Sequence, residues 1–294
     1  MSAKNKFKGQ AIIAGGGFTR AAYDCPVLAE DCKICLLSCF QFLVQDFRSG
    51  SGKAAKRPEY KVDYSLLWQP WEVPTDWGYI EMAPVKERRR GGSPPSGVRF
   101  KVPLVCLLRN RKRSGEDYGK VREALSVLES FEFAPEGRPP RRGIITDLSI
   151  EPKRRGDMER RYASAHFTVP TDVVMEMLDF GGGFCRFGED EAYKLKTFAA
   201  KRLYQIFCTN EKTLSVPLGT VKTWLGVQDR YSRPACFRKR IVEKSVRLVN
   251  GPETGLDVIY SVQKVRDVTV LNFTFGPPKG RQQEEQNEQE QQEM

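Results

Sequence analysis

Four cysteines near the start of the chain are the first residues whose type and spacing suggest chemistry. Cys25, Cys32, Cys35 and Cys39 include a CxxC pair, which is common in metal sites. Cys32, Cys35 and Cys39 also share one face of an expected helix, where a buried cysteine packs as a small hydrophobic side chain. A tetrahedral site needs ligands from at least two segments, and the remaining cysteines are scattered singly. We therefore favour core packing over a metal site, and we expect no cofactor.

A single histidine, His166, is the second informative feature of the sequence. Nicking enzymes of the rolling-circle type hold a metal ion with a His-hydrophobe-His pair, and zinc hydrolases also rely on histidine ligands. One histidine excludes both mechanisms and argues against a Ser-His-Asp site. His166 stands in a strand-like run, so we interpret it as a structural residue.

Two glycine-rich stretches resemble nucleotide-binding loops but lack essential residues. In the stretch GSGK, residues 50–53, the phosphate-loop pattern requires Gly where Phe47 stands and Ser or Thr where Ala54 stands. The stretch GGGF, residues 15–18, lacks the third glycine of a dinucleotide-binding turn. We therefore expect neither an ATPase nor a dehydrogenase.

The overall charge favours a polyanionic partner. The chain has 294 residues, with 48 Lys and Arg against 37 Asp and Glu, and its net charge is +11. Such a surplus favours nucleic acid first and an acidic membrane surface second, although a basic protein without a specific polyanion remains an alternative. No run of about eighteen apolar residues occurs, so we expect no membrane span. The apolar stretch AIIA is too short for a signal peptide, which favours a cytoplasmic location.

The strongest candidate site is a basic helix expected over residues 234–249, which we call the basic helix. Apolar side chains gather on one side of its helical wheel: Phe237, Ile241, Val242, Val246, Leu248 and Val249. Charged side chains gather opposite them: Lys239, Arg240, Glu243, Lys244 and Arg247. The alternative to a binding site is that these charged side chains form the solvated face of an ordinary amphipathic helix.

Basic residues on both flanks favour nucleic-acid binding over that alternative. Arg230 and Arg233 precede the helix, and Lys264 and Arg266 sit at the expected tip of a following β-hairpin. The turn and the hairpin would meet phosphates, whereas arginines near the start of the helix would meet base edges. The DNA-binding residues predicted here are Arg230, Arg233, Arg238, Lys239, Arg240, Lys244, Arg247, Lys264 and Arg266.

The first half of the chain has basic clusters of its own, at residues 109–113, 138–142 and 153–161. They suggest a second DNA-facing surface less specifically, because each cluster alone is a common type of loop. The candidate residues are Arg109, Arg111, Lys153, Arg154, Arg155, Arg160 and Arg161.

Hydrophobic periodicity predicts the elements that must position these residues. In the first half we expect a helix at 26–47, a strand at 97–102, and helices at 103–113 and 116–131. A hairpin of two strands at 143–150 and 162–169 follows, and then a helix at 170–180. The second half has a helix, a short strand, two helices and a hairpin expected at 190–208, 214–216, 217–226, 234–249, 256–263 and 267–275. The two halves have the same order, which predicts an α+β fold of tandem winged-helix domains, a helix-turn-helix with a β wing in pseudo-repeat.

These elements suggest five segments. We expect a flexible arm at residues 1–24 and a first winged-helix domain at 25–185. That domain includes a Trp-rich insertion at about 48–97. Within it, two prolines interrupt the stretch WQPWEVPTDWGY, residues 68–79, which we expect to be irregular or edge-like. A second winged-helix domain, the main DNA reader, spans 189–276, and a disordered tail rich in Gln and Glu spans 277–294.

Three stretches of the second half resemble a known family. LKTFAAKRLYQIF, LSVPLGTVKTWLGV and YSRPACFRKRIVEKSVRLVN, followed by the expected hairpin, are similar in order and spacing to the theta-type plasmid replication initiator (Rep) proteins. The resemblance covers about the last 110 residues clearly and residues 98–165 weakly. The Trp-rich region has no counterpart in that family, and the hairpin turn KVRD lacks the usual glycine.

The resemblance implies two winged-helix domains and a non-enzymatic role in replication. Such proteins bind direct repeats (iterons) in double-stranded DNA at a plasmid origin as monomers and help to open an A+T-rich segment. They recruit a host initiator and the replicative helicase, and as homodimers in equilibrium with monomers they repress their own gene. This also implies a bacterial cytoplasm. By resemblance, residues 238–240, Lys244 and Arg247 lie on the reading helix, and Arg230 and Arg233 contact the flanking backbone.

Two alternatives stay open at this point. A winged-helix transcription regulator without a replication role has the same elements. A nucleic-acid enzyme with a basic surface belongs to another class, against which the single histidine and the missing phosphate loop argue.

Overall fold

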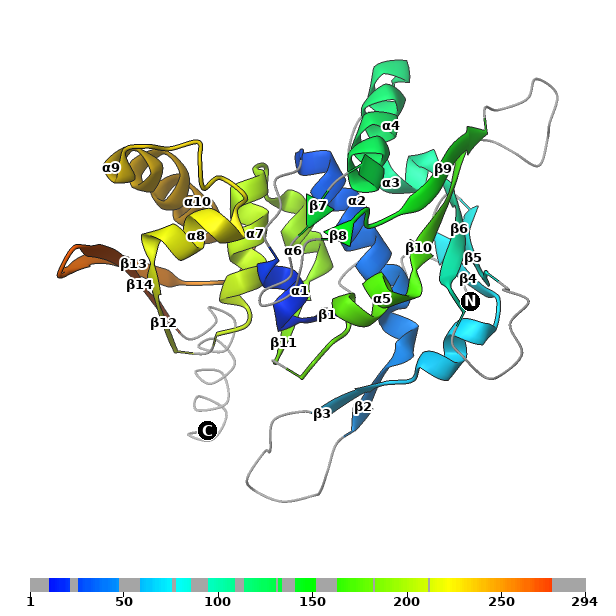
Figure 1. The fold of residues 1–294 in the computed structure, drawn as a ribbon, viewed down its shortest axis with the longest axis horizontal. Helices are drawn as coiled ribbons and strands as arrows, with labels where there is room; N and C mark the ends of the chain where they lie inside the picture. Colours follow the sequence, from blue (N-terminus) through cyan, green and yellow to red (C-terminus); the bar gives the residue numbers. More distant parts are fainter. Residues whose placement is uncertain are drawn as a thin grey trace, which may run out of the picture.

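A computed structural model gives the architecture of most of the chain (Figure 1). It describes residues 11–21, 26–47, 59–75, 78–85, 95–108, 114–130, 132–133, 141–151, 163–181, 183–210 and 212–276. Outside these residues lie Cys25, the expected tail at 277–294 and the basic residues predicted in the first half, Arg109, Arg111, Lys153, Arg154, Arg155, Arg160 and Arg161. Helices and sheets are mixed through the described part, which confirms the α+β class.

The described part of the expected N-terminal arm belongs to the core instead, so the prediction of a flexible arm is wrong for residues 11–21. Strand β1 (Ala11–Gly15) pairs antiparallel with β11 (Phe184–Gly188), and helix α1 (Gly16–Arg20) follows directly. Ile12 and Phe18 are buried in the core. Pairing with a strand distant in sequence satisfies the backbone of this glycine-rich stretch, which periodicity within the stretch does not reveal.

Close packing against the backbone of Asp179 requires glycine at position 15. A Cβ atom at Gly15 would lie 2.4 Å from the backbone oxygen of Asp179, so no larger residue fits without displacing the chain. The N–H of Gly16 then donates to the carbonyl of Gly183 at 2.8 Å, which continues the contact past the end of the strand.

Helix α2 (Val27–Cys39) is a central helix, not a surface helix with one apolar face. Every residue from Leu28 to Cys39 is buried, so its cysteines pack in the core as expected. The helix is shorter than the predicted span of 26–47 because a 3-10 turn, η1 (Phe40–Leu43), and a strand, β2 (Val44–Phe47), follow it. A helix that is buried all round shows no polar stripe that would mark its end.

The first half is built on a five-stranded antiparallel sheet with the order β4-β5-β6-β10-β9. Its strands are β4 (Trp71–Thr75), β5 (Gly78–Pro84), β6 (Gly97–Pro103), β9 (Thr146–Glu151) and β10 (Ser164–Pro170). A smaller hairpin pairs β2 with β3 (Glu59–Val62). The expected pairing of the runs at 143–150 and 162–169 is thereby confirmed.

The Trp-rich region is ordered where the structure describes it, because it extends this sheet. β4 is the edge strand, as its proline predicted: Pro74 has no N–H to donate and is tolerated at an edge. Of the two expected possibilities, irregular or edge-like, the edge strand is confirmed for β4, and β4 and β5 pair as regular strands. The indole of Trp71 donates to the carbonyl of Leu66 at 2.8 Å and stacks on Phe42 with ring centroids 4.3 Å apart.

Three helices and a short strand pair complete the first half: α3 (Leu104–Leu108), α4 (Gly115–Ser130), α5 (Thr171–Met177), β7 (Glu132–Phe133) and β8 (Arg141–Arg142). Ser114 and Asp117 cap the start of α4 reciprocally, since each side chain accepts the backbone N–H of the other. The helix expected at 116–131 is confirmed over most of its length, and it buries Val121, Leu125 and Leu128 on one face.

The second half begins with two helices where the sequence predicted one at 190–208. α6 (Glu189–Lys194) and α7 (Phe198–Phe207) are separated by residues 195–197, and the Thr197 side chain accepts the N–H of Ala200 to cap α7. The apolar residues of 190–208 recur at helical spacing without interruption, so periodicity alone does not reveal that Thr197 caps a new helix within this range.

The remaining elements surround a three-stranded antiparallel sheet with the order β12-β14-β13. They are β12 (Thr213–Pro217), α8 (Leu218–Trp224), α9 (Pro234–Phe237), a π-turn (Arg238–Val242), α10 (Glu243–Val249), β13 (Val258–Val265) and β14 (Val268–Phe275). In both sheets the strand that comes last in sequence lies between its two predecessors, in β6-β10-β9 as in β12-β14-β13.

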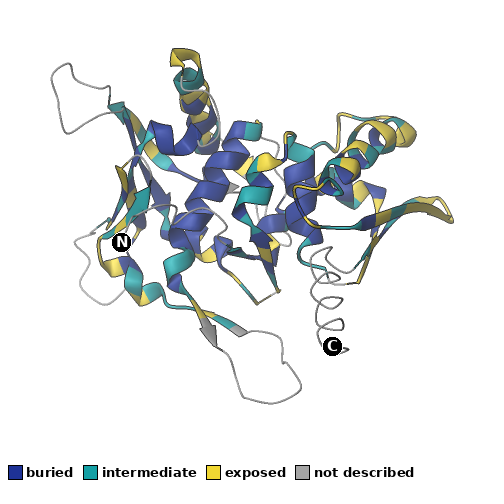
Figure 2. Cartoon of the chain, turned by 180° about the vertical axis from the view of Figure 1, so that it is seen from behind, coloured by how far each residue is buried: buried dark blue, intermediate teal, exposed yellow. Residues whose placement is uncertain are grey.

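Helices α2 and α7 lie side by side in the middle of the molecule, with the five-stranded sheet at one end and the β13–β14 hairpin at the other (Figure 1). Buried polar contacts join them. Lys201 Nζ lies 2.7 Å from Asp31 Oδ1, and the Gln205 amide donates to Glu30 Oε1 at 2.8 Å. Figure 2 shows that buried residues concentrate in these central helices.

Burial of these charges leads to a stability prediction. Lys201→Met should lower the free energy of unfolding by about 3–5 kcal/mol, because it leaves the Asp31 carboxylate without its buried cationic partner. The exposed Lys212→Met is the matched control and should change stability by less than about 0.5 kcal/mol. Urea unfolding of both variants measures the difference. Equal stabilities would show that the buried pair contributes nothing to the junction.

Candidate nucleic-acid interface

The basic helix is a continuous helical segment formed by α9, the π-turn and α10. Pro234 occupies its first turn, where the missing N–H has no cost, and Asn250 ends it. Tyr231 and Phe237 pack with ring centroids 5.5 Å apart, and the ammonium of Lys222 lies over the Phe237 ring at 5.8 Å. These contacts fix the start of the helix against α8.

The π-turn changes which side chains face the core. The N–H of Glu243 donates to the carbonyl of Arg238 in the i to i+5 pattern, so one extra residue enters this turn. Of the apolar side predicted from the wheel, four residues are buried: Phe237, Val242, Val246 and Val249. Ile241 and Leu248 are only half-buried. For Ile241 the reason is the inserted residue, which moves Val242 into the position that Ile241 would take in a regular helix.

The predicted basic residues of the helix and its preceding turn are placed together at the surface. The exposed ones are Arg230, Arg233, Lys239, Arg240, Lys244 and Arg247, while Arg238 is half-buried. Lys222 fastens the turn, because its ammonium donates a hydrogen bond to the carbonyl of Tyr231, between Arg230 and Arg233. Figure 2 shows exposed residues along this region and along the β13–β14 hairpin.

The hairpin adds two exposed cations beside the helix. Val265 pairs with Val268, so the link is the tight turn at Arg266 and Asp267, and Arg266 adopts a left-handed φ of 53° in place of a glycine. Side chains alternate along a strand, so Lys264 faces the same side as Tyr260 and Val262, which line a groove against α10. Lys264 therefore points to the helix side of the hairpin, and Arg266 stands at its tip.

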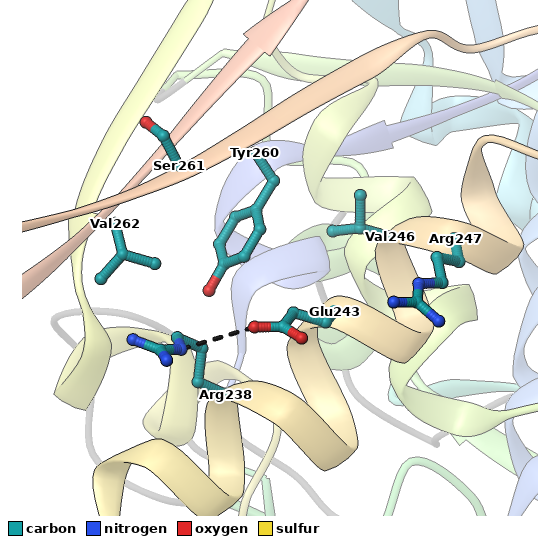
Figure 3. Close-up of a pocket in the computed structure, with 7 residues that line it drawn as sticks. All are labelled: Arg238, Glu243, Val246, Arg247, Tyr260, Ser261 and Val262. Carbon is teal, nitrogen blue, oxygen red and sulfur yellow. Dashed lines mark ion pairs between the residues drawn. The ribbon is translucent and has the colours of Figure 1, made fainter.

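A groove of about 540 Å³ separates α10 from β13, and Figure 3 shows the side chains that line it. Arg238 and Glu243 form an ion pair, with Nε and Oε1 3.5 Å apart. Burial raises the pKa of Tyr260 to about 12, with the Arg238 guanidinium opposing that rise and the Glu243 carboxylate adding to it. The phenol is therefore protonated at neutral pH and can donate a hydrogen bond.

Sequence reasoning missed the part that Glu243 and Tyr260 play in this groove. On the helical wheel Glu243 lies on the charged side, as an acidic residue among basic ones. That difference in charge was the sign in the sequence that Glu243 has a role of its own. Tyr260 alternates with exposed residues on an expected strand, and no local pattern indicates that its ring faces a helix.

The first half presents a different surface at the described residues. Helix α4 exposes Glu116 and Glu123 as well as Lys120 and Arg122, so it has no basic surplus. The candidate residues expected to form a second DNA-facing surface, at 109–113 and 153–161, lie outside the described residues. Within the described part, the concentration of cations is therefore on the second half.

His166 and the described cysteines, which were considered for catalysis or metal binding, lie in the environment of ordinary structural residues. His166 is half-buried in β10, with Nε2 3.4 Å from Oε2 of Glu151. Among the described residues, no group of three or more His, Cys, Asp and Glu side chains is arranged to hold a metal ion. In that same part of the chain, every helix is too short or too polar to cross a membrane.

Comparison with solved structures places this arrangement in a known fold. The chain is similar to the Pi initiator protein, solved in complex with iteron DNA, with a TM-score of 0.54 and 14% sequence identity over 91% of this chain and 97% of that one. This likeness confirms, at the level of the fold, the resemblance predicted from the sequence. RctB domains 2–3 also match, with a TM-score of 0.35 and 14% identity over 71% of this chain and 91% of that one. No protein-family model and no curated protein matches the chain.

The exposed helix leads to a binding prediction. Arg240→Ala with Lys244→Ala should weaken binding to a cognate duplex by about 1–3 kcal/mol for each side chain that reads a base. Where a side chain meets phosphate instead, the negative slope of log K against log salt should become shallower by about one. The fold should be retained because both side chains are exposed. Anisotropy titrations over a range of salt concentrations measure both effects, with Lys212→Ala as control. Unchanged affinity and slope would remove these residues from the interface.

Proposed function

We propose that this protein is a plasmid replication initiator that binds repeated origin DNA (iterons) in a sequence-specific manner. The fold that it shares with the Pi initiator, a protein solved with iteron DNA, supports this proposal. The observation that carries it is the set of exposed cations on one helix, Lys239, Arg240, Lys244 and Arg247, framed by Arg230 and Arg233 in the preceding turn. A surface of this charge matches the phosphates that border a DNA groove.

We infer that the molecule contains two winged-helix domains in tandem. In the first half α3 and α4 lie between β6 and the β9–β10 pair in sequence, with the short β7–β8 pair also in that interval, and in the second half α8 and the basic helix lie between β12 and the β13–β14 pair. In each set of three strands the last strand lies in the middle. That arrangement supports a helix-turn-helix with a β wing in each half. Of the two, the second half is the main reader, because α4 of the first half exposes as many acidic as basic residues whereas the basic helix exposes mostly cations.

The proposed binding mode follows from the geometry of the second half. The basic helix enters the major groove, which is about 12 Å wide and accepts one α-helix. Arginines along its exposed side meet base edges, and Arg230 and Arg233 meet the adjacent phosphates. Lys264 and Arg266, on the hairpin, reach the backbone or the neighbouring minor groove. Double-stranded DNA is thus the proposed partner.

The later steps of initiation belong to the same proposal. In the cytoplasm of a bacterium, the bound protein helps to open an adjacent A+T-rich segment and recruits the host initiator and the replicative helicase. A homodimer in equilibrium with the monomer represses the gene for the protein. Each step relies on binding and not on catalysis, so the protein is proposed not to be an enzyme and to need no cofactor.

A plasmid test separates this function from its main alternative, a winged-helix transcription regulator. A plasmid with the gene and its flanking DNA should replicate, deletion of the gene should abolish replication, and supply of the protein in trans should restore it. The variant with Arg240→Ala and Lys244→Ala should fail to restore replication, whereas Lys212→Ala should succeed. Replication of the deleted plasmid, together with altered expression of a neighbouring gene, would favour the regulator. Nicking or ATP hydrolysis by the pure protein would favour an enzyme.

A further inference from the structure

One acidic side chain faces the groove beside the basic helix. Glu243 lies in the groove between α10 and β13, and its carboxylate faces Nε of Arg238 at 3.5 Å (Figure 3). The Arg238 side chain is 37% exposed and the Glu243 side chain 31% exposed, so the pair is partly shielded from water but remains within reach of a ligand. Arg247 also lines this groove. Glu243 is the one acidic side chain among the residues that line it.

The π-turn is the reason that Arg238 and Glu243 meet. In a regular α-helix, residues five apart point in different directions, and the neighbours on one face are three or four apart. The extra residue in the turn from Arg238 to Val242 brings Arg238 and Glu243 to the same side. Four residues further on, Arg247 follows on that side by ordinary helical spacing.

The ion pair leaves one end of the guanidinium available. Glu243 faces Nε, and in Figure 3 the two terminal nitrogens of Arg238 lie on the side away from the carboxylate. Two parallel N–H groups of this kind match O6 and N7 of guanine in the major groove, and they also match two oxygens of a phosphate. Arg238 alone therefore does not distinguish a base edge from the backbone.

Glu243 supplies the distinction. A phosphate held by the terminal nitrogens of Arg238 would lie within a Debye length of the Glu243 carboxylate, about 8–10 Å at physiological salt, and the two negative charges would repel each other. Guanine is neutral, so the same carboxylate does not repel it, and its attraction for the Nε side of Arg238 favours an orientation in which the terminal nitrogens point away from it. Specificity often depends on such a repulsive element against the wrong partner.

We propose that Glu243 is a specificity-determining residue, which positions Arg238 for a guanine edge and disfavours a phosphate at the same place. This inference rests on the proposed function, because it assumes that the basic helix binds DNA. Its ligand chemistry is a guanine in a G·C pair that faces the groove, contacted by Arg238 while Glu243 remains paired with Nε.

The test compares specific and non-specific binding of wild-type protein and Glu243→Gln, a variant of nearly the same shape without the charge. The probes are a duplex that wild-type protein enriches from a random-sequence pool and a scrambled duplex of the same composition. Non-specific affinity should rise about three- to ten-fold, and the slope of log K against log salt for the scrambled duplex should steepen by about one. Affinity for the enriched duplex should change by less than about two-fold, so that discrimination falls.

Two further variants keep the test decisive. Glu253→Gln removes the same charge from an exposed pair with Lys194, 3.1 Å away and outside the groove, and should leave discrimination unchanged. Arg238→Lys keeps the charge but has no planar fork, so it should bind the scrambled duplex as wild type does and lose preference at a single G·C pair. Thermal unfolding of each variant checks that the fold is retained.

The outcomes that overturn the inference are distinct from failure of the proposed function. An equal rise for both duplexes would show that Glu243 acts only as a general negative charge. A decrease in affinity confined to the enriched duplex, with preference abolished at a C·G pair, would show that Glu243 itself contacts cytosine. Unchanged binding in Arg238→Lys would place Arg238 on phosphate. If wild-type protein enriches no duplex at all, the proposed function is wrong, and that result is independent of the role of Glu243.

Discussion

The arrangement of the whole molecule depends on helix α7, which packs in two directions at once. Toward the first half it presents polar groups, and Lys201 and Gln205 make buried contacts with Asp31 and Glu30 of α2. Toward the second half it presents aromatic surface, since the Phe207 ring lies 4.9 Å from the Phe273 ring. Because one rigid helix carries both sets of contacts, the sheet of the second half has a defined position relative to the first.

Buried ionic contacts of this kind specify an arrangement more than they stabilise it. Charges removed from water lose hydration, and their mutual attraction recovers that loss only when the geometry is good. A junction between α2 and α7 made of apolar side chains would tolerate small rotations, whereas the contact of Lys201 with Asp31 requires the two charged groups to meet at a short distance. The carbonyl of Ala21, which accepts from Arg202 at 2.7 Å, brings the N-terminal segment into the same junction.

The proposed DNA-binding surface depends on a local irregularity placed on that framework. Because the π-turn inserts a residue between Phe237 and Val242, both can be buried while Arg238 and Glu243 face the groove together. Irregular turns are disfavoured in a helix unless surrounding contacts select them, and here the buried aromatic at Phe237 and the sheet beneath α10 do so. The same turn that fits the helix to the core thus arranges the polar side chains of the groove.

Much of the second half was predictable from local sequence. The helix from Pro234 onward, the exposure of Lys239, Arg240, Lys244 and Arg247, and the hairpin around Arg266 follow from periodicity and from the residue types that begin and end such elements. The break before Thr197 was missed, because a capping threonine inside an amphipathic pattern looks like an ordinary polar position.

What the sequence by itself determined is the class of fold, the position of the basic helix and the sign of its exposed face, because periodicity and charge are properties of neighbouring residues. Only the tertiary structure decided that residues 11–15 form a core strand, that the Trp-rich segment extends a sheet, and that Glu243 meets Arg238. Each of these depends on contacts outside the local repeat: β1 needs β11, β5 needs β6, and the i to i+5 pair needs a turn that core packing selects. A local pattern contains no information about such partners until the chain is folded.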